Sequence, residues 1–234
     1  MNILQLLKVL RKTFLTPIKS RQSYSQCAED LIVDQFFRGL NKSDRSKFYV
    51  DVGSHHPKRG SNTYRLYKSG WRGILIDMED DKVLSSKLAR PRDTVIKAAV
   101  SNKIEEVAIY SPGTFSTNAT VSVELSQSDE SYKKTDTINT QRLDVILEEN
   151  NCPYNFDFLS IDIEGNDYKA LQGLSLGRFM PSLICVENYE SQKGVKYLLK
   201  SKIHNYLLTN SYDLIGWSGP STFYSKQTSL NITK

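Results

Sequence analysis

Short apolar runs alternate with amphipathic segments along most of the chain. The apolar runs predict five strands, at residues 48–52, 73–77, 94–100, 158–163 and 182–187. They are apolar on both faces, as the strands of a buried parallel sheet are. Helical spacing of apolar residues predicts helices between most of them, at 62–69, 82–88, 143–150, 167–174 and 194–209. This alternation predicts an α/β fold with right-handed crossovers and a mainly parallel, doubly wound sheet.

The C-terminal region has a different pattern. Two strand-like runs, residues 212–217 and 222–226, flank the turn sequence Ser-Gly-Pro-Ser at 218–221. Two strands joined by such a short turn predict an antiparallel hairpin, which we place on the edge of the sheet.

The first residues of the chain predict a separate helix. Apolar residues recur there at helical spacing before Pro17, namely Ile3, Leu6, Leu7, Leu10 and Phe14. We therefore expect a basic amphipathic N-terminal helix within residues 1–21 and a single domain over residues 22–234. We expect this helix to pack on its own domain or on a second subunit, and a membrane surface or a docking partner is the alternative.

One stretch interrupts the regular alternation. Residues 111–135 are rich in Ser, Thr and Asn and have little apolar periodicity. A long irregular segment in a compact domain is either a binding loop or an insertion without a role. Because this one follows the third predicted strand on the side where ligands bind in such sheets, we expect a lid.

Composition and charge exclude several classes of protein. With 39% hydrophobic and 24% charged residues, the chain has the composition of a soluble globular protein. Five of its 31 basic residues, and none of its acidic ones, fall in residues 1–21, which leaves 26 basic and 26 acidic residues elsewhere. Such a neutral domain is not expected to bind nucleic acid. Three widely spaced cysteines without a CxxC pair predict neither disulfides nor a zinc site. We expect a cytoplasmic protein, with peripheral membrane contact through residues 1–20 as an open alternative.

Carboxylates end four of the five predicted strands, at Asp51, Asp77, Asp162 and Glu187. In an open α/β sheet, ligands bind outside the carboxyl ends of the strands, where the strand order reverses. A single acid in such a place often caps a helix or turn. Four acids at one edge of the sheet indicate a binding crevice.

The residues after the first strand narrow the kind of ligand. Gly53 allows a close approach of the backbone, and Asp77 follows at about the ~20-residue offset at which an acid meets a ribose hydroxyl. The dinucleotide fingerprint is absent, because the chain has His55 and Lys58 where further glycines would be needed. A ribose-bearing ligand without phosphates fits better, and S-adenosylmethionine is such a ligand.

Five motifs occur in a consistent order, at residues 25–30 (SQCAED), 49–57 (YVDVGSHHP), 61–63 (SNT), 70–77 (GWRGILID) and 158–165 (FLSIDIEG). Together they resemble the FkbM-type methyltransferase family, from about residue 24 to residue 190. The resemblance implies a Rossmann-like class I methyltransferase fold with S-adenosylmethionine as the methyl donor. It also implies O-methylation, often of sugars in glycans or of natural-product hydroxyls.

The resemblance matches Asp51, Gly53 and Asp77 to the donor-site positions of the family. It further implies that the Gln26 segment and Ser61-Asn62 help to close the pocket. The predicted donor site as a whole comprises Gln26, Asp51, Gly53, Ser54, Ser61, Asn62, Asp77, Met78, Ala99 and Asp162.

Methyl transfer to an alcohol requires alignment of the reactants and removal of the hydroxyl proton. His55 and His56 are candidate bases, although a histidine in such a turn also bonds readily to the backbone. Glu164 is a third candidate catalytic residue, with orientation of the donor or capping of the next helix as its alternatives. A metal is the other solution, and Asp162 and Glu187 offer the oxygen ligands that Mg²⁺ prefers.

The sequence thus predicts an S-adenosylmethionine-dependent O-methyltransferase for a sugar hydroxyl of a glycan or glycoconjugate. One alternative is a lipid-linked, peptide or small-metabolite acceptor, and the basic N-terminal helix would suit a lipid-linked one. The other alternative is a non-catalytic binding module on the same fold. Such a module is expected to lose the strand-end acids, which this chain retains.

Overall fold

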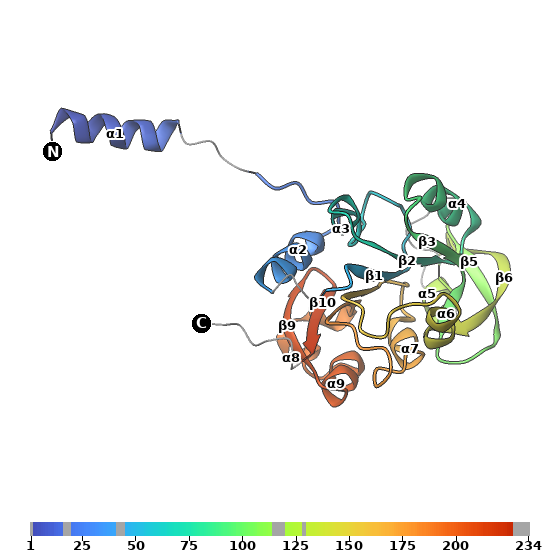
Figure 1. The fold of residues 1–234 in the computed structure, drawn as a ribbon. Coiled ribbons are helices and arrows are strands. Elements are labelled where there is room, and N and C mark those ends of the chain that lie inside the picture. The colour runs from blue at the N-terminus through green and yellow to red at the C-terminus, as the bar shows by residue number, and fades with distance from the viewer. Residues whose placement is uncertain (1, 16–19, 41–44, 114–119, 128–129, 227–234) are drawn as a thin grey trace.

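A seven-stranded sheet forms the centre of the computed structural model, which describes residues 2–15, 20–40, 45–113, 120–127 and 130–226. The strands lie in the order β3-β2-β1-β7-β8-β10-β9. Figure 1 shows β3, β2 and β1 side by side, with the hairpin of β10 and β9 on the other side of the domain. Their bounds are β1 Phe48–Val52, β2 Arg72–Asp77, β3 Thr94–Lys97, β7 Phe158–Ile161, β8 Leu183–Glu187, β9 Tyr212–Ser218 and β10 Ser221–Lys226. The first five are parallel, and β10 is antiparallel to both of its neighbours. The predicted parallel sheet and C-terminal hairpin are confirmed.

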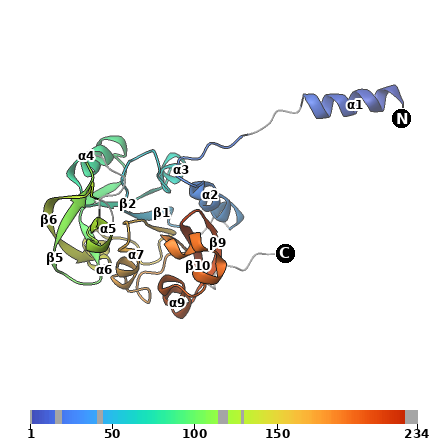
Figure 2. The same ribbon diagram turned by 180° about the vertical axis from the view of Figure 1, so that it is seen from behind.

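Helices cover both faces of the sheet, and alternate residues of β1 point to different layers. Tyr49 packs in the cluster that includes α2 (Glu29–Gly39) and the residues around α3 (Tyr64–Lys68). Val50 and Val52 pack in the larger cluster on the opposite face. That face is covered by α6 (Leu143–Glu149), α7 (Asp167–Gln172) and α9 (Lys202–Thr209). Figure 2 shows the same layers from behind.

The helix α2 is absent from the elements that the apolar pattern predicted. Its buried apolar residues are Val33 and Phe37, which lie four residues apart on one face. The predicted helix over 194–209 is two helices, α8 (Val195–Leu198) and α9. The break occurs because the Ser201 side chain caps α9 by accepting a hydrogen bond from the backbone N–H of His204.

The predicted strand over 94–100 is also two elements. After Lys97 the chain turns away from β2, and β4 (Ala99–Ser101) pairs instead with β6 (Lys133–Arg142). The backbone N–H of Ala98 donates to the carbonyl of Asp77 at 3.0 Å, which fixes this turn. A second sheet results, with the order β4-β6-β5, in which β5 is Glu106–Ser111.

The second sheet takes up part of the segment that was expected to be an irregular loop. Within 111–135, β5 ends at Ser111, α5 spans Val123–Gln127 and β6 begins at Lys133. Residues 114–119 and 128–129 of the expected lid lie outside the described residues. The lid stays a prediction.

The N-terminal helix α1 (Ile3–Phe14) has no buried residue, and Figures 1 and 2 show it clear of the domain. It begins with a capping box, in which Asn2 and Gln5 each bond the backbone N–H of the other. Pro17, which was expected to end it, lies outside the described residues. In the described part of the chain, no helix combines the length and the apolar character needed to cross a bilayer.

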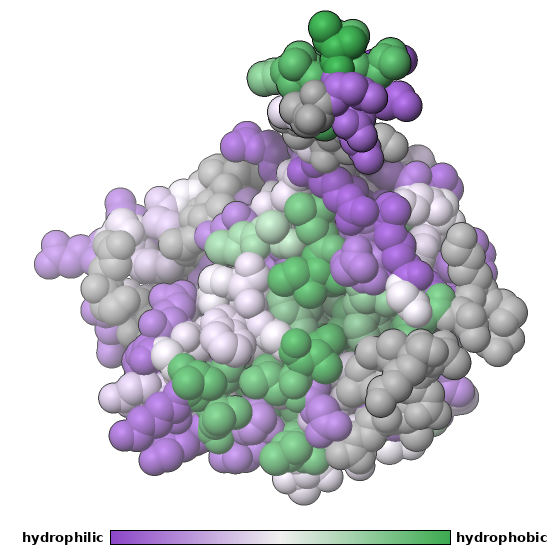
Figure 3. All heavy atoms as spheres, turned by 90° about the vertical axis from the view of Figure 1, so that its left-hand side faces the viewer, coloured by the Kyte–Doolittle hydropathy of each residue, from purple (hydrophilic) through white to green (hydrophobic). Residues whose placement is uncertain are grey.

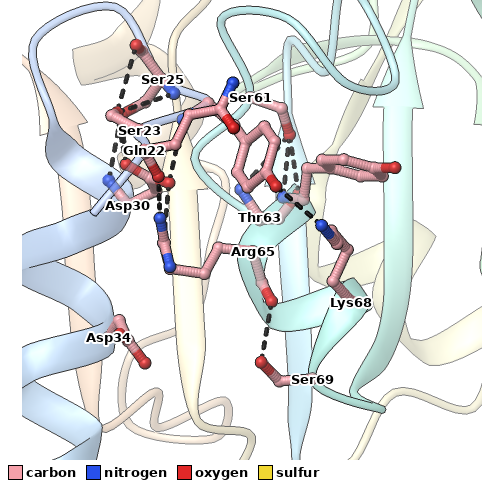
Figure 4. A network of polar contacts seen from close by, with 12 residues as sticks. Gln22, Ser23, Ser25, Asp30, Asp34, Ser61, Thr63, Arg65, Lys68 and Ser69 are labelled. Carbon is pink, nitrogen blue, oxygen red and sulfur yellow. Dashed lines mark hydrogen bonds and ion pairs between the residues drawn. The ribbon is translucent and has the colours of Figure 1, made fainter. Parts of the chain in front are cut away.

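Residues 22–30 are fastened to the domain by the polar network drawn in Figure 4. The buried Asp30 carboxylate accepts hydrogen bonds from Ser23 and Ser25 and from the Arg65 guanidinium, the last at 3.0 Å. Arg65 also donates to the carbonyl of Gln22. The chain therefore joins the domain firmly at Gln22, and α1 lies beyond that point.

Candidate functional site

A cavity of about 520 Å³, counting the open space at its mouth, lies at the carboxyl ends of β1, β2 and β7 and beside the start of β4. The cavity lies where the strand order reverses between β1 and β7, which is where open α/β sheets bind ligands. Its lining residues are Val52, Gly53, His55, Ile76, Asp77, Met78, Lys82, Ala98, Ala99, Val100, Val121, Asp162, Ile163 and Glu164.

The predicted donor-site residues divide into two groups. Gly53, Asp77, Met78, Ala99 and Asp162 line the cavity. The other predicted residues do not line it: Gln26, Asp51, Ser54, Ser61 and Asn62. Gln26 is exposed and Ser54 is buried.

Three residues of the second group belong to polar contacts inside the domain. Asp51 accepts a hydrogen bond from Thr63 at 2.5 Å, and the buried Arg90 donates to Thr63 at 2.9 Å and to Ser61 at 3.4 Å. Asn62 donates to Ser160 at 3.1 Å. These contacts hold the turn before α3 against β1 and β7. In this structure they support the wall of the cavity, and their part in donor binding stays a prediction.

Gly53 makes a close contact within the protein. Its φ of +81° is in the left-handed region, and a Cβ there would lie 1.8 Å from the carbonyl oxygen of Asp162. Only glycine permits this approach without a shift of backbone. The turn after β1 and the end of β7 can therefore form one continuous wall.

Asp77 lies at the end of β2, with its carboxylate oriented by backbone groups. One oxygen accepts from the N–H of His55 at 2.8 Å, and the other accepts from the N–H of Glu79 at 3.1 Å. Burial raises the pKa of this carboxyl, while the nearby Lys82 and these N–H groups lower it. Because the residue lines the cavity, this oriented carboxylate can accept hydrogen bonds from a ligand there.

The two histidines have different surroundings. His55 lines the cavity, and burial, Lys82 and His56 lower its pKa to about 4, so the ring is neutral at pH 7. Its Nδ1 has no hydrogen-bond partner among the described residues. His56 does not line the cavity, and its Nδ1 accepts from the backbone N–H groups of Lys58 and Arg59. His56 therefore closes a turn in this structure.

A second hollow, a groove of about 880 Å³ counting the open space above it, lies beside the first at the ends of β7 and β8. Three tyrosines line it, Tyr168, Tyr189 and Tyr197, and the last two are 40% and 52% exposed. The remaining lining residues are Gly165, Asp167, Glu187, Asn188, Glu190, Lys200, Ser201, Lys202 and Ile203. Sequence reasoning gave no indication of this groove, because its walls come from α7, α8 and the 3₁₀ helix at Tyr189–Lys193 (η1).

Carboxyl groups lie between the cavity and the groove. Asp162 lines the cavity and Asp167 and Glu187 line the groove, yet one oxygen from each lies within 4.8 Å of the others. Burial and the mutual repulsion of the group raise the pKa values of Asp162 and Glu187. Burial raises the pKa of Asp167 to about 6. We call these three residues the acidic cluster.

Glu164 and Tyr189 form a second link between the two hollows. Glu164 lines the cavity and Tyr189 lines the groove, and the tyrosine hydroxyl donates to the Glu164 carboxylate at 2.8 Å. The Glu164 carbonyl accepts from the hydroxyl of Thr120 at 2.9 Å. Thr120 and the cavity-lining Val121 belong to the expected lid, so the described part of that segment reaches the site.

A family model described as the methyltransferase FkbM domain matches residues 51–213. The chain belongs to the FkbM methyltransferase family. As a member, it is an S-adenosylmethionine-dependent methyltransferase, and the resemblance found in the sequence is confirmed. The strand order and the antiparallel hairpin give it the class I methyltransferase fold.

No curated protein matches this FkbM methyltransferase in sequence. Among solved structures, the O-methyltransferase from Bacillus cereus in complex with SAH is 13% identical, with a TM-score of 0.46, over 95% of this chain and 89% of that one. The TehB-like SAM-dependent methyltransferase from Corynebacterium glutamicum is 11% identical, with a TM-score of 0.43, over 96% of both chains. Similarities at this level say nothing about the acceptor.

Several residues of the methyltransferase site carry no sequence signal of their own. Lys82, Asp167 and Tyr189 lie in helical segments, where a charged or aromatic residue is ordinarily on the surface or in the core. Only the strand order brings α4 (Asp80–Ala89), α7 and η1 to one end of the sheet.

Proposed function

We propose that the protein is an O-methyltransferase that methylates a sugar hydroxyl of a glycan or glycoconjugate. The observation that carries this proposal is the pair of adjoining hollows. One has the position and the strand-end acid of a donor site, and the other is an open groove lined by tyrosines. Carboxylates that can accept a proton lie between them.

The donor belongs in the cavity. Asp77 would accept hydrogen bonds from the ribose hydroxyls, and Met78 and Ala99 would pack against the nucleoside. Asp162 and Glu164, at the end of β7, would lie toward the methyl-bearing end, because the groove begins on that side.

The groove favours a saccharide acceptor. A sugar ring has apolar faces that pack on tyrosine rings and hydroxyls that need polar partners. Tyr189 and Tyr197 supply exposed rings, while Asn188, Lys200 and Ser201 supply polar groups. An open groove also accommodates one residue of a longer glycan, which a closed pocket would exclude.

Glu164 is the residue we assign to proton removal. When bound, the donor supplies a methyl group already activated on a sulfonium, so the chain has only to align the acceptor oxygen and take up its proton. As the oxygen–methyl bond forms and the sulfur–methyl bond breaks with its electron pair going to sulfur, the hydroxyl proton passes to the Glu164 carboxylate. Tyr189, which donates to this carboxylate, keeps it oriented toward the groove.

The acidic cluster fits a divalent cation such as Mg²⁺. Its three oxygens are close enough to share one ion, and Glu187 Oε2 is buried without a hydrogen-bond partner among the described residues. Asp162, Asp167 and Glu187 would hold the ion. When bound, Mg²⁺ supplies positive charge that lowers the pKa of a coordinated hydroxyl.

Radiolabelled methyl transfer to a panel of cell-wall glycans, synthetic glycosides, peptides and small hydroxyl-bearing metabolites tests the proposal. We expect label on saccharides alone, and Tyr197→Ala should raise the KM for the saccharide while donor binding stays unchanged. Label on peptides or metabolites but not on saccharides would overturn the sugar assignment. Tight donor binding without any transfer would favour a non-catalytic module.

A further inference from the structure

The helix α1 presents an apolar face that nothing in its own domain covers. Its large apolar residues are 41–75% exposed, from Leu6 at the lower end to Ile3 and Phe14 at the upper end. In Figure 3, which views the molecule from the side of α1, the apolar side chains gather on one side of the helix and the hydrophilic ones on the other. In this structure the helix does not pack on its own domain.

A helix as short as α1 needs contacts on its apolar face to be stable. Isolated helices shorter than about 12–15 residues are marginal in water, and α1 has 12 residues. The capping box stabilises only its first turn. A surface that takes up the apolar face would supply the stabilisation that tertiary packing gives to other helices.

The charges of α1 indicate which kind of surface covers its apolar face. The helix contains Lys8, Arg11 and Lys12 and no acidic residue, and no acid occurs anywhere in residues 1–21. Two copies of α1 packed together would place like charges side by side without an acidic partner. A bilayer with anionic headgroups instead matches both sides of the helix, because it takes up the apolar face and attracts the basic flanks.

We propose that α1 is a peripheral membrane anchor that lies in the headgroup region of an anionic bilayer. The anchor rests on α1 alone, so it stands whether or not the acceptor is a sugar. Gln22 is fastened to the domain, and the seven residue steps from Leu15 to Gln22 span at most about 25 Å. The catalytic domain is therefore held within that distance of the membrane surface.

Vesicle flotation of the full chain tests the anchor. The probes are phosphatidylcholine vesicles with and without about one third phosphatidylglycerol, at low and high salt. We expect the wild type to float with the anionic vesicles only, and less well at high salt. The triple variant Lys8→Glu, Arg11→Glu, Lys12→Glu should lose at least about tenfold in partition. The double variant Leu6→Gln, Leu10→Gln should lose binding while keeping the charge.

A matched charge control lies elsewhere on the domain. Lys87→Glu, Lys169→Glu, Lys196→Glu makes the same change in net charge at positions outside α1, and it should float as the wild type does. Circular dichroism should show added helix on anionic vesicles in the wild type and in this control, but not in the α1 variants. Equal binding to neutral and anionic vesicles, or flotation unaffected by the α1 variants, would overturn the proposal. So would a dimer that forms through α1 without any vesicle binding.

Discussion

At the scale of single residues, Asp77 is the sharpest test of the donor site. Its two oxygens are already oriented by backbone N–H groups, and the residue lines the cavity. Asp77→Ala should weaken S-adenosylmethionine binding about 10- to 100-fold in calorimetry, because hydrogen bonds to a charged group are lost. Asp80→Ala, three residues further on, is the control, since the Asp80 side chain is 81% exposed and forms an ion pair with Lys97 outside the cavity. Equal binding by both variants would place the donor elsewhere.

Glu164 gives a second residue-scale prediction. Glu164→Gln should lower kcat about 100-fold or more, because the amide cannot accept the acceptor proton. Calorimetry should show unchanged donor binding, which separates loss of the base from loss of the donor. Tyr189→Phe removes the hydrogen bond that orients Glu164 but leaves the Glu164 carboxylate in place, so its loss of kcat should be smaller. A Glu164→Gln enzyme with wild-type kcat would exclude this residue as the base.

The sequence identified several residues of the site but did not predict what they contact in the fold. Strand-end acids and Gly53 were found because residue type and spacing carry that signal. The contact of Gly53 with the Asp162 carbonyl was not found, since it depends on the pairing of β1 with β7. Asp51 was grouped with the donor residues, yet it bonds Thr63, because Arg90 enters this layer from a distant part of the chain.

At the scale of elements, the junction between β1 and β7 holds the site together. Gly53→Ala should destabilise the protein by about 3 kcal/mol or more, since its Cβ would meet backbone and its φ is strained. Gly60→Ala is the matched control. Gly60 also has a positive φ, of +66°, but no atom lies within 4 Å of the place that an added Cβ would take, so only about 1 kcal/mol of strain is expected. Urea unfolding of the two variants measures the difference.

The acidic cluster at the ends of β7 and β8 makes stability depend on pH. Burial and its acidic neighbours raise the pKa of Glu187 above the ordinary value of 4.5. A raised folded-state pKa contributes stability below pH 4.5 that is lost as the pH rises through the folded-state value. The wild type should therefore lose stability from about pH 5 to about pH 9, and Glu187→Gln should flatten this slope. Thermal melts across this range measure both.

Thermal melts in the presence of Mg²⁺ test whether the acidic cluster binds a metal. Bound cation should raise the Tm of the wild type at about pH 8, an effect that EDTA reverses and Glu187→Gln abolishes. Full methyl transfer in excess EDTA, together with no shift in Tm, would exclude the metal.

Most helices and strands could be predicted from the sequence, whereas the pairing of the strands could not. The parallel strands and the hairpin follow from apolar runs and turn residues. The break after Lys97 was invisible because Val95, Ile96 and Val100 are equally apolar on both sides of it. The strand β6 was missed because most of its residues are polar and exposed, so its pairing with β4 and β5 leaves no apolar period.

At the scale of the whole molecule, α1 and the domain should behave as independent units. Deletion of residues 1–15 should leave the Tm and the affinity for S-adenosylmethionine unchanged, because no residue of α1 is buried. Differential scanning calorimetry and donor titration check this. A fall of several degrees in Tm would show that α1 contacts the domain in solution.

With α1 in a bilayer as proposed, the short link from α1 to Gln22, which Arg65 fastens to the domain, also affects which acceptors are methylated. An enzyme held within about 25 Å of a bilayer encounters molecules embedded in that bilayer at a high effective concentration, whereas freely diffusing molecules gain nothing from the tether. Two acceptors with identical sugars would then be methylated at different rates according to whether they carry a lipid. The short link between helix and domain would thus select the location of the acceptor, while the tyrosine-lined groove selects its chemistry.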